Sequence, residues 1–220
     1  MKKLLTTLCL VLIVSCSEPE VLDGPFLMRD GITFDQKTNK PITGKTEIFH
    51  ENGRLESRSN YKDGKLDGLH EEFYVELLEE FYKNGERKKR ENYKDGKKDG
   101  LNETFYYNGR LEKRENYKDG KLDGLHETFY KNGQLDHRSN YKDGKLDGLR
   151  EVFHENGQLF FSVNFIEHKR DGLRESFHEN GQLWVKGYWR DDKPVGLREY
   201  FDERGNLTKT EEYKNGVLQE

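Results

Sequence analysis

Residues Gly124–Asp147 read GLHETFYKNGQLDHRSNYKDGKLD, and the same pattern begins again at Gly148 after 24 residues. Self-similarity at a fixed period is the mark of a repeat architecture. The step between successive opening glycines is 24 residues, except for one step of 32. These glycines are Gly44, Gly68, Gly100, Gly124, Gly148, Gly172 and Gly196. The chain is therefore one short motif repeated over residues 44–220.

Each unit carries two turn signals. Asn-Gly stands at 52–53, 84–85, 108–109, 132–133, 156–157 and 180–181, and Asp-Gly stands at 63–64, 95–96, 119–120 and 143–144. Both dipeptides favour the positive φ angles of a type I′ turn, which joins two antiparallel strands. The sequence therefore predicts an all-β fold, an elongated single-layer antiparallel meander of about seven 24-residue β-hairpin repeats.

The register follows if every loop has two residues. Counting outward from each Asn-Gly then places an acid opposite a base in five hairpins, as Glu47–Arg58, Glu79–Arg90, Glu103–Arg114, Glu127–Arg138 and Glu175–Lys186. A repeated, matched glutamate indicates a structural ladder rather than a set of catalytic carboxylates. The same counting through Asp143-Gly144 places Tyr141 opposite Leu146 and Arg138 beside Leu149.

Composition agrees with a thin sheet. Only 32% of the 220 residues are hydrophobic and 36% are charged, against roughly 45–50% and 25% in ordinary domains. A deep core is therefore not expected. Aromatic residues recur at fixed slots between turns, and stacked repeats of that kind are stable without a conventional core.

The N-terminus is a separate segment. Lys2 and Lys3 precede an apolar run over residues 4–14 that is too short to cross a membrane as a helix. The following Ile13-Val14-Ser15-Cys16 resembles a bacterial lipobox, which implies removal of residues 1–15 and lipid attachment at Cys16. An ordinary secretory signal cut nearby is the alternative. Because Ser17 rather than Asp follows Cys16, the outer membrane of a Gram-negative cell is favoured, on its periplasmic or surface face.

Residues 16–25 are then expected to form a lipid-anchored tether, and residues 26–43 a divergent capping segment with a strand at Arg29–Phe34 and a turn at Thr38–Pro41. With Cys9 discarded, Cys16 is the one cysteine left, so neither a disulfide framework nor a cysteine-based metal site is expected. Loss of Lys2 and Lys3 takes the net charge from −4 to −6, which argues against a nucleic-acid partner.

The 32-residue step contains a duplication. Glu71–Tyr74 recurs as Glu79–Tyr82, so eight residues are inserted near 69–82. The insert lacks Gly, Pro and Asn. It is an overlong strand, a bulge or one helical turn.

Units such as residues 124–135 followed by residues 141–148 resemble the variant MORN repeat, the membrane occupation and recognition nexus type. The opening Pro41–Gly44 leading into Phe49–Gly53 is similar to bacterial proteins of the YwqK family of antitoxins. The resemblance covers about residues 30–218. It implies phospholipid contact, scaffolding and dimerisation as family properties.

A search for chemistry identifies no catalytic residue, cofactor site or metal site. His50, His154 and His178 occupy a unit slot that elsewhere holds tyrosine, and the glycines are spaced as turns rather than as a phosphate loop. Aromatic residues gather in the C-terminal units instead. Phe160, Trp184 and Tyr188 share a face by the pairing rule, and with Trp189 they form a candidate binding surface; the alternative is that they thicken the core there.

These features together predict a lipid-anchored, non-catalytic binding or scaffold module at the bacterial envelope. Its partner is expected to be a protein or a glycan. The first alternative is an antitoxin-like or immunity partner that masks another protein, and the second is an exported enzyme that acts on the cell wall.

Overall fold

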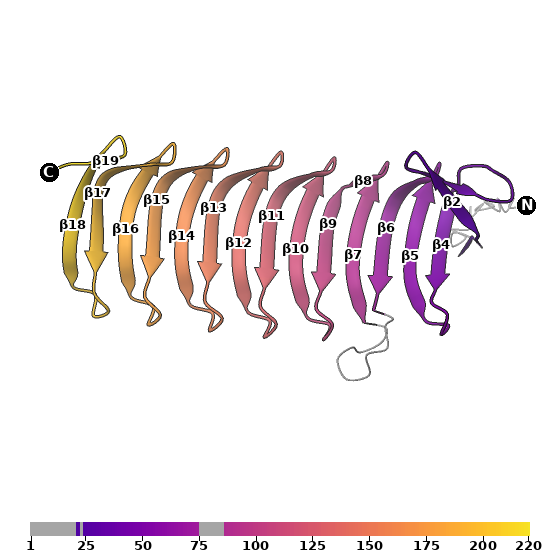
Figure 1. Cartoon of the computed structure of the whole chain (residues 1–220), viewed down its shortest axis with the longest axis horizontal. Helices are drawn as coiled ribbons and strands as arrows, with labels where there is room; N and C mark the ends of the chain where they lie inside the picture. The colour runs from indigo at the N-terminus through magenta and orange to yellow at the C-terminus, as the bar shows by residue number, and fades with distance from the viewer. Residues whose placement is uncertain (1–20, 23, 75–85) are drawn as a thin grey trace, which may run out of the picture.

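The computed structural model describes residues 21–22, 24–74 and 86–220. The predicted signal peptide, Cys16 and residues 75–85, which include the second copy of the duplicated segment, lie outside the described residues. The predicted meander is confirmed: a single 17-stranded sheet runs the length of the molecule, with antiparallel strands joined in sequence order (Figure 1). Its strands are β1 (Val21–Leu22), β4 (Gly44–Phe49), β5 (Leu55–Lys62), β6 (Lys65–Phe73), β7 (Arg87–Lys94), β8 (Lys97–Lys98), β9 (Gly100–Phe105), β10 (Leu111–Lys118), β11 (Lys121–Phe129), β12 (Leu135–Lys142), β13 (Lys145–Phe153), β14 (Leu159–Ile166), β15 (Lys169–Phe177), β16 (Leu183–Arg190), β17 (Lys193–Phe201), β18 (Leu207–Lys214) and β19 (Val217–Leu218).

The Asp-Gly turns have the expected geometry. Asp143 and Gly144 take φ of 50° and 83°, and the other Asp-Gly turns match them. Non-glycine residues fill the same positions in two later units, where Glu167 (47°), His168 (72°), Asp191 (48°) and Asp192 (65°) also have positive φ. Positive φ at both central residues defines the type I′ turn, so this half of the turn prediction is confirmed.

The Asn-Gly loops differ from the expectation of a two-residue turn. Gly133 has φ of 93°, but Asn132 is not among the residues with positive φ. The Tyr130 amide donates to the Gln134 carbonyl, and the Gly133 amide donates to the Tyr130 carbonyl. This is a three-residue loop in which a type I turn is followed by a left-handed glycine. The Asn132 side chain accepts from the Gln134 amide, which explains the asparagine.

A bulge near the Asp-Gly turn shifts the register between the two strands by two residues. Ser139 pairs with Arg150, but Tyr141 pairs with Leu146, so Asn140 faces three residues of β13. The two extra residues place Arg138 opposite Glu151 rather than beside Leu149. Gly148 has φ of 111°, and the Asn140 side chain packs against it and donates to the Leu149 carbonyl. Because two residues are added, each side chain keeps its face and the pairing moves into step with the 24-residue repeat.

The pairing next to the duplicated segment differs from the prediction. Glu71, in the first copy of the duplicated segment, stands opposite Arg90, and Arg90 is opposite Glu103 on its other side. The predicted Glu79–Arg90 pair is therefore wrong, and Glu79 itself lies outside the described residues. Strand β6 begins just after the Asp63-Gly64 turn and includes Glu71–Phe73 of the first copy, so the first copy lies in the sheet. Phe73 pairs with Arg87 at the end of this hairpin.

A separate hairpin of β2 (Phe26–Arg29) and β3 (Ile32–Asp35) precedes the first repeat and lies against its Asp63-Gly64 turn. The predicted single strand Arg29–Phe34 is wrong, because Asp30 and Gly31 form one more turn with positive φ at both positions. The hairpin docks on the first repeat through a hydrogen bond from the Thr33 amide to the Gly64 carbonyl. Val21–Leu22, within the predicted tether, forms a short strand parallel to β4.

Neighbouring units are joined at both ends of the strands. At the Asp-Gly end, the Gly144 amide donates to the Leu122 carbonyl and the Asp143 amide donates to the Asp123 carboxylate. At the Asn-Gly end, the Tyr130 hydroxyl donates to the Phe153 carbonyl of the next unit. Among the described residues, the buried apolar side chains are Ile42, Leu146, Val163 and Val185. Because these are few, the sheet depends on the repeated polar contacts. Within the described ranges, no helix is long and apolar enough to cross a membrane.

Candidate functional site

The two faces of the sheet carry different rows of side chains. The first, here called the ladder row, occupies one register position on every strand from β4 to β18 except the two-residue β8, and contains the predicted glutamates and bases other than Glu79. Its members are Glu47, Arg58, Glu71, Arg90, Glu103, Arg114, Glu127, Arg138, Glu151, Ser162, Glu175, Lys186, Glu199 and Thr210. Acid and base alternate through most of the row, which supports a structural reading.

Each base in the ladder row lies between two glutamates, one on each adjacent strand, and can form an ion pair with either. Arg114 contacts Glu103 at 3.2 Å and Glu127 at 3.8 Å. Arg138, although directly opposite Glu127, bonds to Glu151 at 2.8 Å. Lys186 likewise bonds to Glu199 at 3.0 Å. The predicted cross-strand positions are therefore right for four pairs, but the bases bond mostly to the glutamate of the following unit, because the bulge brings that residue opposite them.

The opposite face carries a second row, here called the central row, which occupies the register position next to the ladder. It consists of Thr46, Ser59, His70, Glu91, Asn102, Glu115, His126, Ser139, Arg150, Val163, Arg174, Gly187, Arg198 and Glu211. Sequence reasoning missed this row. Its signal is the residue before each ladder glutamate, which changes from His70 and His126 to Arg150, Arg174 and Arg198 along the chain.

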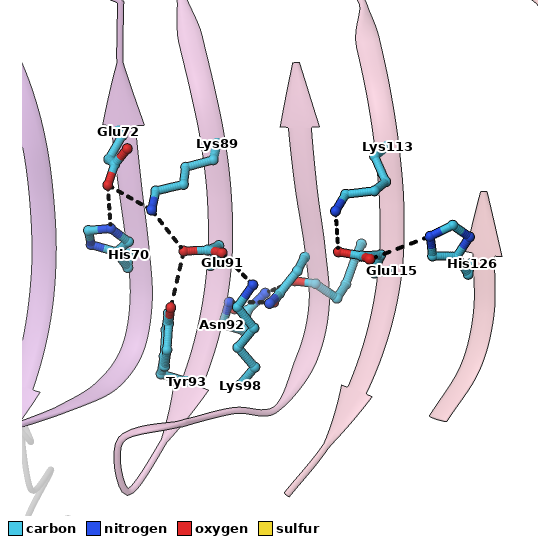
Figure 2. Close-up of polar contacts among 12 residues, drawn as sticks. His70, Glu72, Lys89, Glu91, Asn92, Tyr93, Lys98, Lys113, Glu115 and His126 are labelled. Atoms are coloured by element: carbon cyan, nitrogen blue, oxygen red, sulfur yellow. Dashed lines mark hydrogen bonds and ion pairs between the residues drawn. The ribbon is translucent and has the colours of Figure 1, made fainter. Parts of the chain in front are cut away.

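In the N-terminal half, charged groups of this face pair with one another, although the buried Asn102 Nδ2 and His126 Nδ1 have no hydrogen-bond partner within the described structure. Glu91 receives Lys98 at 2.8 Å, Lys89 at 3.3 Å and the Tyr93 hydroxyl at 3.1 Å, and Lys89 also contacts Glu72 at 2.7 Å (Figure 2). Burial acts to raise the pKa of Glu91, but the hydrogen bonds and charges of Lys98 and Lys89 outweigh burial and lower the pKa. Burial, with the charge of Glu91, raises the pKa of Tyr93 to about 12. This half is a closed network of paired charges.

One part of this network has the connectivity of a hydrolase triad. Ser59 Oγ lies 2.7 Å from His70 Nδ1, and His70 Nε2 lies 3.4 Å from Glu72. Ser59 is only 5% exposed, and Lys89 already neutralises Glu72. A catalytic serine must reach a substrate carbonyl, with oxyanion donors beside it. The arrangement therefore serves as a polar cross-strand contact.

A shallow groove of about 500 Å³ lies further along the same face, at the Asn-Gly end. His137 forms one wall and stacks on His126 with ring centroids 5.2 Å apart. Burial lowers the pKa of His126 more than the charge of Glu115, 3.5 Å away, raises it. Burial therefore favours the neutral form of His126 inside an otherwise ionic surface.

In the C-terminal half the same row changes character. Arg150, Arg174 and Arg198 have no carboxylate within ion-pair distance in the described part of the chain. Aromatic rings lie beside them instead. The Phe161 ring is 5.9 Å from the guanidinium carbons of both Arg150 and Arg174, and the Tyr200 ring is 5.1 Å from that of Arg198. This half is a cationic and aromatic surface.

The predicted aromatic surface is divided by the bulges. Phe160 contacts His154 and Phe161, with ring centroids at 4.9 and 5.6 Å, and Trp184 contacts His178 at 6.1 Å. Tyr188 stands opposite Leu173, away from these rings. Phe160, Trp184 and Tyr188 are 38%, 46% and 57% exposed. Trp189 is partly covered, because the Arg170 guanidinium lies 3.9 Å from its ring.

The repeated tyrosine–histidine slot is used between units. Tyr106 and Tyr130 donate to the carbonyls of Phe129 and Phe153, and His178 contacts the Phe201 carbonyl at 2.9 Å in the same way. No group of three or more metal-binding side chains comes together in the regions that the structure describes.

Comparison with protein families assigns the repeat. The family described as the MORN repeat variant matches residues 42–63, 98–119, 122–143, 146–167, 170–191 and 194–215, which is more than half of the chain. The unmatched stretch between the first two matches contains the insert. A comparison with curated proteins finds no similar sequence. Each match ends at the first residue of an Asp-Gly-type turn, so the matched unit agrees with the structural one.

Proposed function

The chain belongs to the MORN repeat variant family, and from that premise we propose that it is a lipid-anchored, non-catalytic module that binds a protein partner at the bacterial envelope. MORN repeats are generally binding and scaffold modules. The observation that carries the proposal is the change along one face of the sheet, from paired charges in the N-terminal half to arginines without acid partners in the C-terminal half. Exposed aromatic residues lie in the same C-terminal units.

The anchor is supported by the sequence. The charged start, the apolar run over residues 4–14 and the Ile13–Cys16 motif together resemble a bacterial lipoprotein signal. A lipid attached at Cys16 would hold the sheet at a membrane, and the acidic mature chain would contribute little to adhesion.

A second function, masking another protein by strand addition, is favoured by the C-terminal edge. β18 pairs with β19 at Tyr213 and Lys214, and the Glu212 carbonyl accepts from the Gln219 amide, so residues 207–211 present an unpaired edge. Such an edge accepts an extended segment from another chain through main-chain hydrogen bonds.

The test uses the full chain expressed in a bacterium with labelled fatty acid. Cys16→Ala should lose the label, and unchanged labelling would contradict the anchor. Stoichiometric capture of an envelope protein should survive Arg190→Gln, a matched arginine change at the exposed end of β16 outside the central row, and should be lost in the Arg150→Gln/Arg198→Gln double variant, because both arginines lie in that row. Equal capture by all three proteins would place the binding site elsewhere.

A further inference from the structure

The arginines of the central row form a regular array. Arg150, Arg174 and Arg198 occupy the same slot in three consecutive units, on β13, β15 and β17. Adjacent strands are about 4.8 Å apart, so the attachment points repeat every ~9.6 Å across the sheet. The residues between them are small: Val163 and Gly187 are buried in the floor of the sheet.

Neighbouring residues leave room for the arginine side chains and orient them. A Cβ on Gly187 would lie 3.2 Å from Arg198 Cγ, so the glycine gives this side chain room to lie on the sheet. Phe161 lies beside both Arg150 and Arg174, and Tyr200 beside Arg198, which orients the guanidinium groups. Glu211, directly opposite Arg198, is instead bonded to Lys209 and to the Tyr200 and Tyr213 hydroxyls.

Part of the hydrogen-bonding capacity of this surface is unused. Arg150 Nε is buried without a partner. Burial, followed by the charges of Arg198 and Arg170, lowers the pKa of Arg174. Half-buried guanidinium groups that repel one another and lack acids are the groups that bind carboxylates most strongly, through charge-assisted bidentate hydrogen bonds.

We propose that this arginine row binds an acidic segment of a partner protein in the polyproline II conformation, with a carboxylate at every third residue. Polyproline II has three residues per turn and rises about 3.1 Å per residue, so every third side chain points the same way and recurs every ~9.3 Å. A β-strand repeats its face every ~6.7 Å. In an α-helix, the repeat of one face that comes nearest to the arginine spacing is seven residues, or ~10.5 Å. Over the two intervals between the three arginines, it falls out of register with them by about 2 Å.

The aromatic residues fit the same ligand. Phe161 and Tyr200 lie beside the arginines of the row, and aromatic-lined surfaces are the usual docking sites for proline-rich segments. The proposal names the ligand chemistry of the binding function proposed above and rests on it.

The test measures binding of a fluorescent peptide, made of repeated Glu-Pro-Pro, to the full chain by anisotropy. Arg174→Gln should weaken binding about tenfold, the loss expected for one bidentate carboxylate contact. The matched control Arg190→Gln removes the same charge from the exposed end of β16, outside the row, and should change affinity less than about twofold. A peptide of the same composition with its glutamates clustered should bind more weakly than the regular one.

Several results would overturn the proposal. Equal affinity for regular and clustered peptides would reject the spacing argument, and equal loss in both arginine variants would reject the row. Arg174-dependent binding of anionic vesicles or a sulfated glycan, without peptide binding, would assign the row to that ligand. If the envelope partner is still captured while no acidic peptide binds, this inference fails and the proposed binding function stands.

Discussion

At the residue scale, ionic side chains take the place of a core. Glu71 is 1% exposed and is bonded to Arg58 and, at 2.8 Å, to Arg87. Removing one partner of such a buried pair would leave an uncompensated charge, which is strongly destabilising, whereas the intact pair adds little net stability. The ladder therefore specifies register more than it adds free energy.

One residue in this polar surface makes stability depend on pH. Burial lowers the pKa of His126 below its ordinary 6.5. The unfolded chain therefore binds a proton first as the pH falls, so the stabilisation is complete above about 6.5 and is lost as the pH falls through the folded pKa. Carboxyl groups with lowered pKa, among them Glu72, Glu91 and Glu211, affect stability only at pH below about 4.5.

We therefore expect the free energy of unfolding in urea to be lower at about pH 5.5 than at about pH 7.5. His126→Gln should reduce this difference, because glutamine does not titrate in that range. The same pH dependence in the parent and in His126→Gln would assign the effect to another group.

At the element scale, each unit combines two kinds of turn that look alike in sequence. Asp143 has φ of 50°, in the left-handed region, whereas in the other loop only Gly133 has positive φ. Left-handed conformation costs most residues about 1–2 kcal/mol, and Asp and Asn tolerate it better. An Asp-Gly or Asn-Gly dipeptide therefore needs a left-handed first residue in one turn but not in the other.

Asp143→Ala should consequently lower the free energy of unfolding by about 1–2 kcal/mol. Asn132→Ala loses two exposed hydrogen bonds, one accepted from the Gln134 amide and one donated to the Glu155 carbonyl, but places no alanine in a left-handed conformation, and it should cost less, about 0.5–1 kcal/mol. Asp143→Asn is the conservative control and should be nearly neutral. Urea melts of the three variants check the order, and an equal cost for Asp143→Ala and Asn132→Ala would mean that the two turns are alike.

At the scale of the whole molecule, the protein is a one-dimensional array. Each strand bonds to its neighbours in sequence, and each turn bonds to the turn of the next unit (Figure 1). Stability in such an array is roughly a sum of unit and interface terms. A complete unit is then removable without breaking the contacts of those that remain.

Deletion of residues 124–147 joins Asp123 to Gly148 and restores a native Asp-Gly junction. This variant should fold with a loss of about 1–4 kcal/mol, the share of one 24-residue unit, and should retain binding of the acidic peptide, because Arg150, Arg174 and Arg198 keep their spacing. Deletion of residues 124–135 removes one strand and one turn, reverses every later strand and should cause misfolding. Circular dichroism and thermal melts distinguish the two, and similar behaviour of both would reject the 24-residue unit.

The period, the alternation of strand and turn and the single-layer meander were determined by the sequence itself, because turn chemistry and periodicity are local properties. Glu47–Arg58, Glu103–Arg114, Glu127–Arg138 and Glu175–Lys186 could be paired by counting alone. The three-residue Asn-Gly loop, the bulge at Asn140 and the use of Glu71 instead of Glu79 were decided only by the tertiary structure. The bulge moves Arg138 to Glu151 and gathers Arg150, Arg174 and Arg198 into one row. It depends on hydrogen bonds between neighbouring strands, which no single segment of sequence specifies.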